Sequence, residues 1–87
     1  MSDTRWTVDI EFYETDRYTS ADAMLEAGPI CYRAWGQARR SDDDPDRPKI
    51  GEEIAAARAL ESLATQLRGL AEHEIEAFEG HPVDVRI

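Results

Sequence analysis

The first segment with a clear periodic pattern is 6–14, in which apolar and polar residues alternate. The apolar members occupy the even positions and are Trp6, Val8, Ile10 and Phe12. Successive side chains of a β-strand point to opposite faces of a sheet, so a period of two predicts a strand with one buried and one wet face. We therefore expect a strand at 6–14.

The segment 18–27 is open to two interpretations. Its Ala, Met, Leu and Glu residues favour a short helix that Ser20 would cap and that Gly28-Pro29 would end. With a period of two, the same residues instead place Ala21, Ala23 and Leu25 on a buried face. Gly28-Pro29 is then a hairpin turn into the next strand. Propensity slightly favours the helix, and turn geometry favours the strand.

The segment 30–40 is predicted to be a strand whose two faces differ in volume. One face carries unusually small side chains and consists of Ile30, Tyr32, Ala34, Gly36 and Ala38. The other face includes Cys31, Arg33 and Trp35. Small residues on the first face would allow a helix to approach the sheet closely.

The strongest helix signal covers 51–68 and follows a polar loop at 41–49. Gly51 is expected at the N-cap, and Glu52 and Glu53 then lie where the helix dipole favours anions. Apolar residues recur every three or four positions, as on one side of a helix, at Ala56, Leu60, Leu63, Leu67 and Leu70. One such helix is long enough to cover a sheet.

After this helix, Gly69 is expected to interrupt the chain. A short second helix is predicted at 72–79, ended by His81-Pro82, and the alternating tail 83–87 is expected to pair with a sheet edge. The expected core consists of Trp6, Val8, Ile10, Phe12, Ala21, Ala23, Leu25, Ile30, Tyr32 and Ala34 from the strands and Ile54, Leu60, Leu63, Leu67, Ile75 and Phe78 from the helices.

Composition restricts the functions that this chain of 87 residues can have. It carries 19 acidic and 10 basic residues, a formal net charge of −9. An acidic surface repels phosphate backbones and anionic membranes at long range. No apolar run approaches the roughly 20 residues of a membrane span, and a single cysteine excludes a disulfide framework. We expect one domain over 1–87 in the cytoplasm, without contact to a membrane.

Two patterns that resemble catalytic or metal sites lack essential parts. Asp42, Asp44, Asp46 and Glu53 have the spacing of EF-hand ligands, but Arg47 stands where that loop needs glycine. Nothing in the sequence positions Cys31 beside His73 or His81 as a nucleophile with its base. We therefore expect no catalytic residue, no metal and no cofactor, and a protein that is not an enzyme.

Two sets of residues are candidates for partner contacts. Basic residues around Trp35 are candidates for contact with RNA or another partner, namely Arg39, Arg40, Arg47 and Lys49. The competing interpretation is that Arg47 and Lys49 pair with the acids of the adjacent loop. Tyr13, Met24, Arg33 and Trp35 would share one sheet face, and these residue types are enriched at the centres of interfaces. We expect them to form a homodimer interface, with coverage of Trp35 by the tail as the alternative.

Four blocks of the sequence resemble a known family. They are 6–10, 46–53, 57–60 and 73–77, and the resemblance runs from Trp6 to about Ala77. The family is one of small actinobacterial proteins of unknown function that includes mycobacterial dormancy-associated proteins. The resemblance implies an α+β fold, with a three-stranded antiparallel sheet packed on one long helix in the order β-β-β-α, similar to a double-stranded-RNA-binding domain (dsRBD-like). It thereby favours a strand at 18–27, with a short C-terminal helix and a tail in addition.

The resemblance also implies function. Members are similar to ribosome hibernation-promoting factors and form homodimers, which implies a non-catalytic stress or dormancy protein acting on the ribosome or translation machinery. Duplex-RNA-binding domains place lysines at the start of their last helix, where this chain has Glu52 and Glu53. We therefore expect no canonical binding of duplex RNA. The alternative function is an acidic protein–protein interaction module with no RNA partner.

Overall fold

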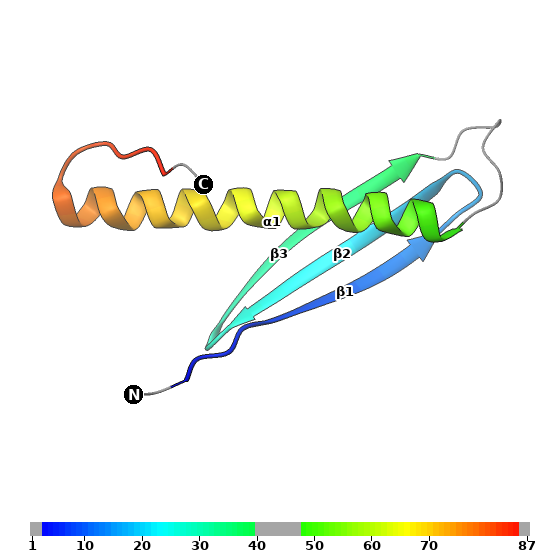
Figure 1. Ribbon diagram of the computed structural model, residues 1–87, viewed down its shortest axis with the longest axis horizontal. Helices are drawn as coiled ribbons and strands as arrows, with labels where there is room; N and C mark the ends of the chain where they lie inside the picture. Colours follow the sequence, from blue (N-terminus) through cyan, green and yellow to red (C-terminus); the bar gives the residue numbers. More distant parts are fainter. Residues whose placement is uncertain (1–2, 40–47, 86–87) are drawn as a thin grey trace.

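The computed structural model describes residues 3–39 and 48–85, which form a three-stranded antiparallel sheet and one long helix (Figure 1). The strands are β1 (Thr7–Glu14), β2 (Tyr18–Ala27) and β3 (Ile30–Arg39), in the spatial order β1-β2-β3. The helix α1 (Pro48–Glu79) packs mainly on β3 and β2. These elements confirm the predicted α+β class and the β-β-β-α order.

Residues 18–27 form a strand. The interpretation as a strand, based on the period of two and the Gly28-Pro29 turn, is therefore confirmed, and the interpretation as a short helix is wrong. Each residue from Thr19 to Glu26 has a partner on both neighbouring strands. The loop Gly28-Pro29 joins β2 to β3, and Gly28 has a φ of +65°. A two-residue hairpin of this kind favours glycine at its first position. Sheet pairing and burial under α1 therefore outweigh local propensity here.

The closest approach of α1 to the sheet is at Gly36, in the middle of β3. A Cβ atom added at Gly36 would lie 2.4 Å from the carbonyl oxygen of Ala55 and 2.4 Å from the amide nitrogen of Ala59. Both are backbone atoms of α1, which cannot rotate away as a side chain can. Only glycine leaves room for this crossing. The small side chains on one face of β3 therefore allow the helix to approach the sheet closely, as predicted.

Alanines make up most of the core at this crossing. Ala21, Ala23, Ala38, Ala55 and Ala59 form one buried cluster, with Ile10 packed against it. Leu25, Ala34 and Leu63 form a second cluster, extended by the partly buried Ala27, Tyr32 and Leu67. The close approach replaces large side chains with backbone contact, so little apolar surface is buried for a chain of this length.

The predicted core was confirmed at Leu25 and Leu63 but wrong at seven other large residues. Those that the structure leaves exposed are Trp6, Val8, Phe12, Ile30, Ile54, Leu60 and Phe78. For Val8 and Phe12 the reason is that α1 crosses over β3 and β2 and leaves the same face of β1 largely uncovered (Figure 1). Phe78 lies on the half of α1 that projects beyond the sheet.

α1 is one continuous helix, and the prediction of two helices at 51–68 and 72–79 was wrong. It begins at Pro48, whose fixed φ suits the first position of a helix, so Gly51 is not an N-cap and Lys49 is not in a loop. Gly51 instead faces Thr19, whose Oγ1 would lie 2.7 Å from a Cβ at that position. Gly69 does not interrupt α1, because its cost of roughly 1 kcal/mol relative to alanine is small beside the flanking helix formers.

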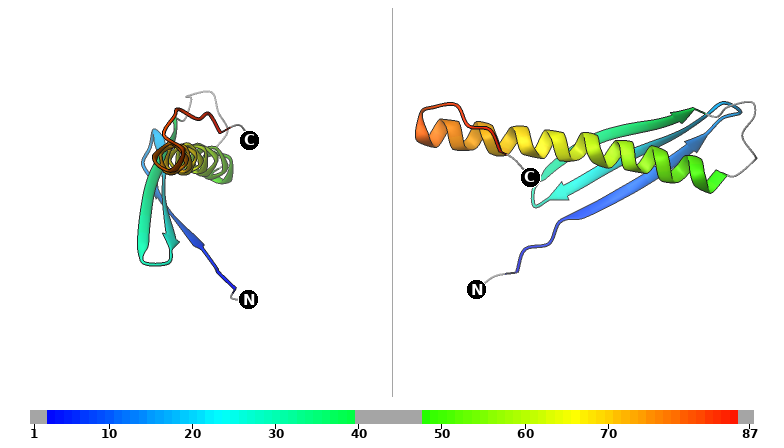
Figure 2. Two further views of the ribbon diagram at one scale, coloured as in Figure 1. Left: turned by 90° about the vertical axis from the view of Figure 1, so that its left-hand side faces the viewer. Right: turned by 45° about the horizontal axis from the view of Figure 1, so that its top comes forward.

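The C-terminal half of α1 projects beyond the sheet, and the tail folds back along it (Figures 1 and 2). A helix of 32 residues is about 48 Å long, whereas a ten-residue strand is about 33 Å long. The amide of Val83 donates to Glu76 Oε1 over 2.9 Å, and that of Val85 donates to Glu72 Oε1 over 3.3 Å. The predicted pairing of the tail with a sheet edge is therefore wrong for residues 83–85 as far as the sheet of the same chain is concerned, and pairing with the sheet edge of a partner chain stays a prediction.

We predict opposite effects for two glycine-to-alanine substitutions. Gly36→Ala should lower the free energy of unfolding by about 1–3 kcal/mol, as overpacking against fixed backbone does. Gly69→Ala should raise it by about 0.5–1 kcal/mol, because a Cβ there meets nothing within 4 Å and alanine suits a helix interior better. Urea denaturation followed by circular dichroism measures both. A neutral Gly36→Ala would contradict the close crossing, and a destabilising Gly69→Ala would contradict a continuous α1.

Candidate functional site

The outer face of the sheet, which we define as the face opposite α1, is the broadest exposed surface built by the strands. The pairing aligns its side chains in rows across all three strands. One row contains Asp9, Met24 and Arg33, and the next contains Glu11, Asp22 and Trp35. These positions follow directly from the period-two pattern of each strand once the register is known.

The four residues predicted for a dimer interface all lie on this outer face. Met24 and Arg33 are direct cross-strand partners, and Trp35 follows Arg33 by two positions on the same face of β3. Tyr13 lies on β1, opposite Ser20. Trp35 is 63% exposed and Tyr13 is 56% exposed, so two large aromatic side chains remain in water on one face. Whether they form an interface remains a prediction.

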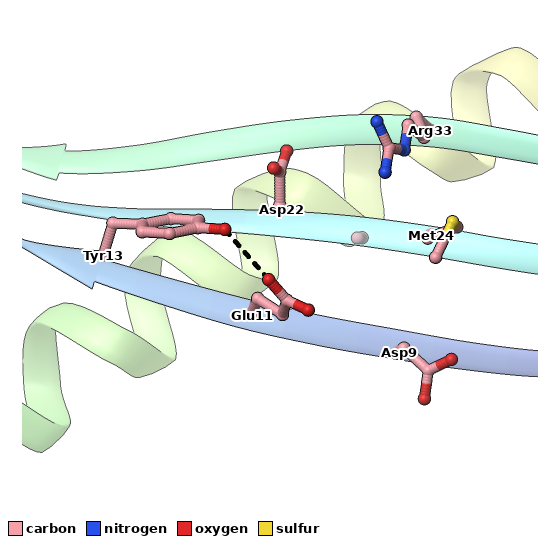
Figure 3. Close-up of a pocket in the computed structure, with 7 residues that line it drawn as sticks. Asp9, Glu11, Tyr13, Asp22, Met24 and Arg33 are labelled. Atoms are coloured by element: carbon pink, nitrogen blue, oxygen red, sulfur yellow. Dashed lines mark hydrogen bonds between the residues drawn. The ribbon is translucent and has the colours of Figure 1, made fainter.

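A hollow in the outer face brings three of these four residues together (Figure 3). It is lined by Asp9, Glu11, Tyr13, Asp22, Ala23, Met24 and Arg33. Trp35 is not part of its lining. The hollow combines an apolar thioether, a phenol and charges of both signs, which suits contact with another protein better than binding of a nonpolar ligand.

The Tyr13 hydroxyl is held by a carboxylate within this hollow. It donates a hydrogen bond to Glu11 Oε2 over 2.9 Å (Figure 3). This hydrogen bond and the negative charge of Glu11 raise the pKa of Tyr13 above its ordinary value of 10.0. The phenol therefore stays neutral at physiological pH and acts here as a donor, not as a base.

Charges on the outer face are divided between its two sides. The acids lie on β1 and β2, at Asp9, Glu11, Asp22 and Glu26, and the bases lie on β3, at Arg33 and Arg39. Within the described residues, no ion pair joins these arginines to these acids. Among residues 3–39 and 48–85, each side of this face therefore presents charge without an ionic partner.

The candidate contacts for RNA or another partner are only partly described. Arg39 is exposed at the end of β3, and Lys49 is exposed in the first turn of α1. Arg40 and Arg47 lie outside the described residues, as do Asp42, Asp44 and Asp46 of the EF-hand-like pattern. Glu52 and Glu53 fall in the second turn of α1, so the first turn carries a lysine and no acid.

The cysteine and the histidines lie on different parts of the fold. Cys31 is exposed on the outer face of β3, His73 is exposed on α1, and His81 follows the helix. His81 Nε2 lies 3.0 Å from Glu79 Oε2. Residues 3–39 and 48–85 contain no group of three or more histidine, cysteine or acidic residues that could hold a metal ion.

The helix of the described chain is not long and apolar enough to cross a membrane.

Sequence reasoning missed the acids that surround the predicted interface residues. The alternation of 6–14 places Asp9 and Glu11 on the same face as Tyr13. Only the register shows that Asp22 is the direct partner of Glu11 and of Trp35. Alternation therefore predicts the outward acids of both β1 and β2, whereas their pairing across the strands depends on the register.

The fold and its surfaces define a small α+β protein in which one helix crosses an antiparallel three-stranded sheet. A match to the family model described as Rv2632c-like covers residues 4–84, and the chain belongs to this family. It is 38% identical over 76 residues to Uncharacterized protein Rv2632c of Mycobacterium tuberculosis strain H37Rv, which covers 87% of this chain and 82% of the relative. It is 36% identical over 77 residues to Uncharacterized protein MT1780 of Mycobacterium tuberculosis strain CDC 1551, with coverage of 88% and 82%.

The fold is also similar to that of a solved relative. The crystal structure of Rv2632c superposes with a TM-score of 0.83 at 34% sequence identity, and the match covers 94% of this chain and 98% of the other. These comparisons confirm the expected family of small mycobacterial relatives. They also show that the helix and sheet are arranged alike in two proteins with about one third of their residues in common.

Proposed function

We propose that this protein is a non-catalytic cytoplasmic factor that forms a homodimer through the outer face of its sheet and acts in stress or dormancy on the translation machinery. The observation that carries the dimer is the exposure of Trp35 and Tyr13 on one face, with Met24 between their strands. Burying a large apolar side chain contributes roughly 1.5–3 kcal/mol. A chain with a core made mostly of alanine gains proportionally more from such burial.

The divided charge of the outer face favours one arrangement of two copies. A two-fold axis parallel to β2 places β3 of one copy over β1 of the other. Arg33 then faces Asp9 of the second copy, because both lie in the row of Met24, and the same contact recurs by symmetry. An axis perpendicular to the strands instead places β1 over β1, with acids opposite acids. The first arrangement resembles the aligned packing of two sheets.

The small area of this face makes it a candidate for a weak, reversible interface. Three strands spaced about 4.8 Å apart and about 33 Å long present a plane of roughly 450 Å². This lies below the roughly 800 Å² per partner of a standard interface. We therefore expect a dimer of micromolar affinity.

We predict that Trp35→Ala raises the dissociation constant of the dimer at least tenfold, as loss of a central aromatic anchor does. Analytical ultracentrifugation at about 100 μM detects a micromolar dimer. Phe78→Ala is the matched control, because Phe78 is 93% exposed on the projecting half of α1, away from the outer face. High salt should weaken the wild-type dimer, because it screens the cross-copy charge pairs.

A wild-type protein that is monomeric at about 100 μM would contradict the homodimer. A dimer that Trp35→Ala leaves intact would remove the interface from the outer face. Equal effects of Trp35→Ala and Phe78→Ala would also contradict this interface.

The translation machinery is proposed as the target because of the resemblance to dormancy-associated relatives. A dsRBD-like grip on duplex RNA is not part of the proposal, since Glu52 and Glu53 replace the lysines that would hold phosphates. If RNA is contacted, Arg39 and Lys49 are the exposed bases of the described chain that would first meet it.

We predict that tagged protein sediments with ribosomes from stationary-phase cells at low salt and dissociates at high salt. Neutralising both Arg39 and Lys49 to glutamine should reduce this association. The matched pair Arg5→Gln and Arg68→Gln removes the same charge from exposed positions elsewhere and should leave it unchanged. A protein that never sediments with ribosomes at low salt would contradict the translation target. The homodimer would be unaffected by that result.

The charge of −9 favours a second function, an acidic protein–protein interaction module with no RNA partner. Retention of the dimer together with absence of ribosome binding would support this function.

A further inference from the structure

The two edges of the sheet differ in what covers them. On β3, the carbonyl oxygen of Gln37 accepts a hydrogen bond from Arg58 Nη1 over 2.6 Å, and that of Arg33 accepts one from Gln66 Nε2 over 2.7 Å. α1 thus covers β3 with both its backbone and its side chains. β1 is the opposite edge strand and makes no backbone hydrogen bond to an element other than β2 within the described residues.

Apart from its acidic side chains, β1 lacks the features that protect edge strands from pairing. Its eight residues contain no proline, no lysine and no residue with positive φ. An edge of this kind is a template for a further strand. All of its side chains except that of Ile10 are exposed.

An apolar shelf adjoins this edge on the side of α1. We define the shelf as Trp6, Val8 and Phe12 on the helix-facing side of the sheet, of which Trp6 is 55% exposed. Leu60 is exposed on α1 and lies about 200° around the helix from Arg58, because successive residues are about 100° apart. Since Arg58 contacts β3, Leu60 is on the side of α1 toward β1. Leu60 therefore adds an exposed apolar side chain on the flank of α1 that faces the direction of the shelf.

The opposite side of the same strand is acidic. Asp9 and Glu11 project to the outer face, and β1 itself carries no basic residue. A second copy of β1 paired antiparallel in a register centred on Asp9, Ile10 or Glu11 would bring these acids opposite or diagonal to the same acids. Like charges in such positions destabilise a strand pair. Pairing of β1 with β1 of a second copy is therefore unfavourable.

We propose that β1 is a docking edge for an extended peptide segment of another protein that alternates basic and apolar residues. The segment adds a fourth strand by backbone hydrogen bonds. Its basic side chains lie beside Asp9 and Glu11, and its apolar side chains lie on the shelf beside Val8 and Phe12. Alternation is required because successive side chains of a strand reach opposite faces. This site does not need the dimer, but it shares the acids of β1 with it, so the peptide and the second copy compete for Asp9.

A synthetic six-residue peptide that alternates lysine and valine is the probe for this site. We expect it to shift the amide NMR signals of β1 and of Leu60, and to slow hydrogen exchange of β1 amides. A peptide of the same composition with three lysines followed by three valines should bind at least tenfold more weakly. The alternating peptide with every second backbone nitrogen methylated should bind more weakly still. Its methylated edge has no N–H groups that could donate hydrogen bonds to the carbonyl oxygens of β1.

Charge-removing variants test the acidic side without disturbing the fold. Asp9→Asn combined with Glu11→Gln should weaken binding of the alternating peptide at least tenfold. The matched control Glu61→Gln with Glu74→Gln removes the same charge from exposed positions of α1 and should leave binding unchanged. Equal binding of the alternating and block peptides, an unaffected methylated peptide, or absence of binding at millimolar concentration would each overturn the proposal. Trp35→Ala should preserve or strengthen peptide binding, because it frees Asp9 from the second copy.

Discussion

The contact on which the rest of the structure depends is the crossing of α1 over Gly36 of β3. At this point the backbones of a helix and a strand touch with no side chain between them. Close packing of this kind requires alanine on both elements, and the surrounding buried residues are mostly alanine. The position of the helix over β3 and β2 follows from this, because only these strands offer a surface low enough for it.

The same contact explains why so much apolar surface stays exposed. A helix seated on β3 and β2 cannot reach over β1, so Trp6, Val8 and Phe12 remain in water. The helix is also longer than the sheet, and its projecting half is held instead by the tail through Glu72 and Glu76. The chain therefore combines a small core with two exposed surfaces, the outer face around Trp35 and the edge at β1. Both proposed interactions use surfaces that this packing leaves uncovered.

Most of the sheet could be predicted from sequence because side-chain alternation reports directly on strands. The small face of β3 also indicated a close helix, and Gly36 confirms it. The extent of α1 could not be predicted, because Gly69 is compatible both with a break and with an uninterrupted helix. In the second case the strong helix formers on either side of Gly69 offset its unfavourable helix propensity. The prediction of the core was wrong at several large residues for a different reason. Periodicity identifies an apolar face but does not show which part of that face the helix covers.

The candidate site could be predicted to a similar degree. The pattern placed Tyr13, Met24, Arg33 and Trp35 on one face, and the structure has them there. It did not show that Asp22 is the cross-strand partner of Trp35, since register depends on turns and pairing. The fold-back of the tail could not be predicted either. It depends on two glutamate carboxylates that accept hydrogen bonds from backbone amides 7 and 13 positions further along the chain, and nothing in the alternation of 83–87 indicates these contacts.

The most direct test of this account is the pattern of nuclear Overhauser effects (NOEs) at Gly36 in the protein in solution. Backbone contact between β3 and α1 predicts strong NOEs from the Gly36 α-protons to the methyl groups or amide protons of Ala55 and Ala59. It also predicts no comparable NOEs from α1 to the α-protons of β1. Absence of the Gly36 contacts, or equal contacts from α1 to all three strands, would contradict a helix seated on β3 and β2.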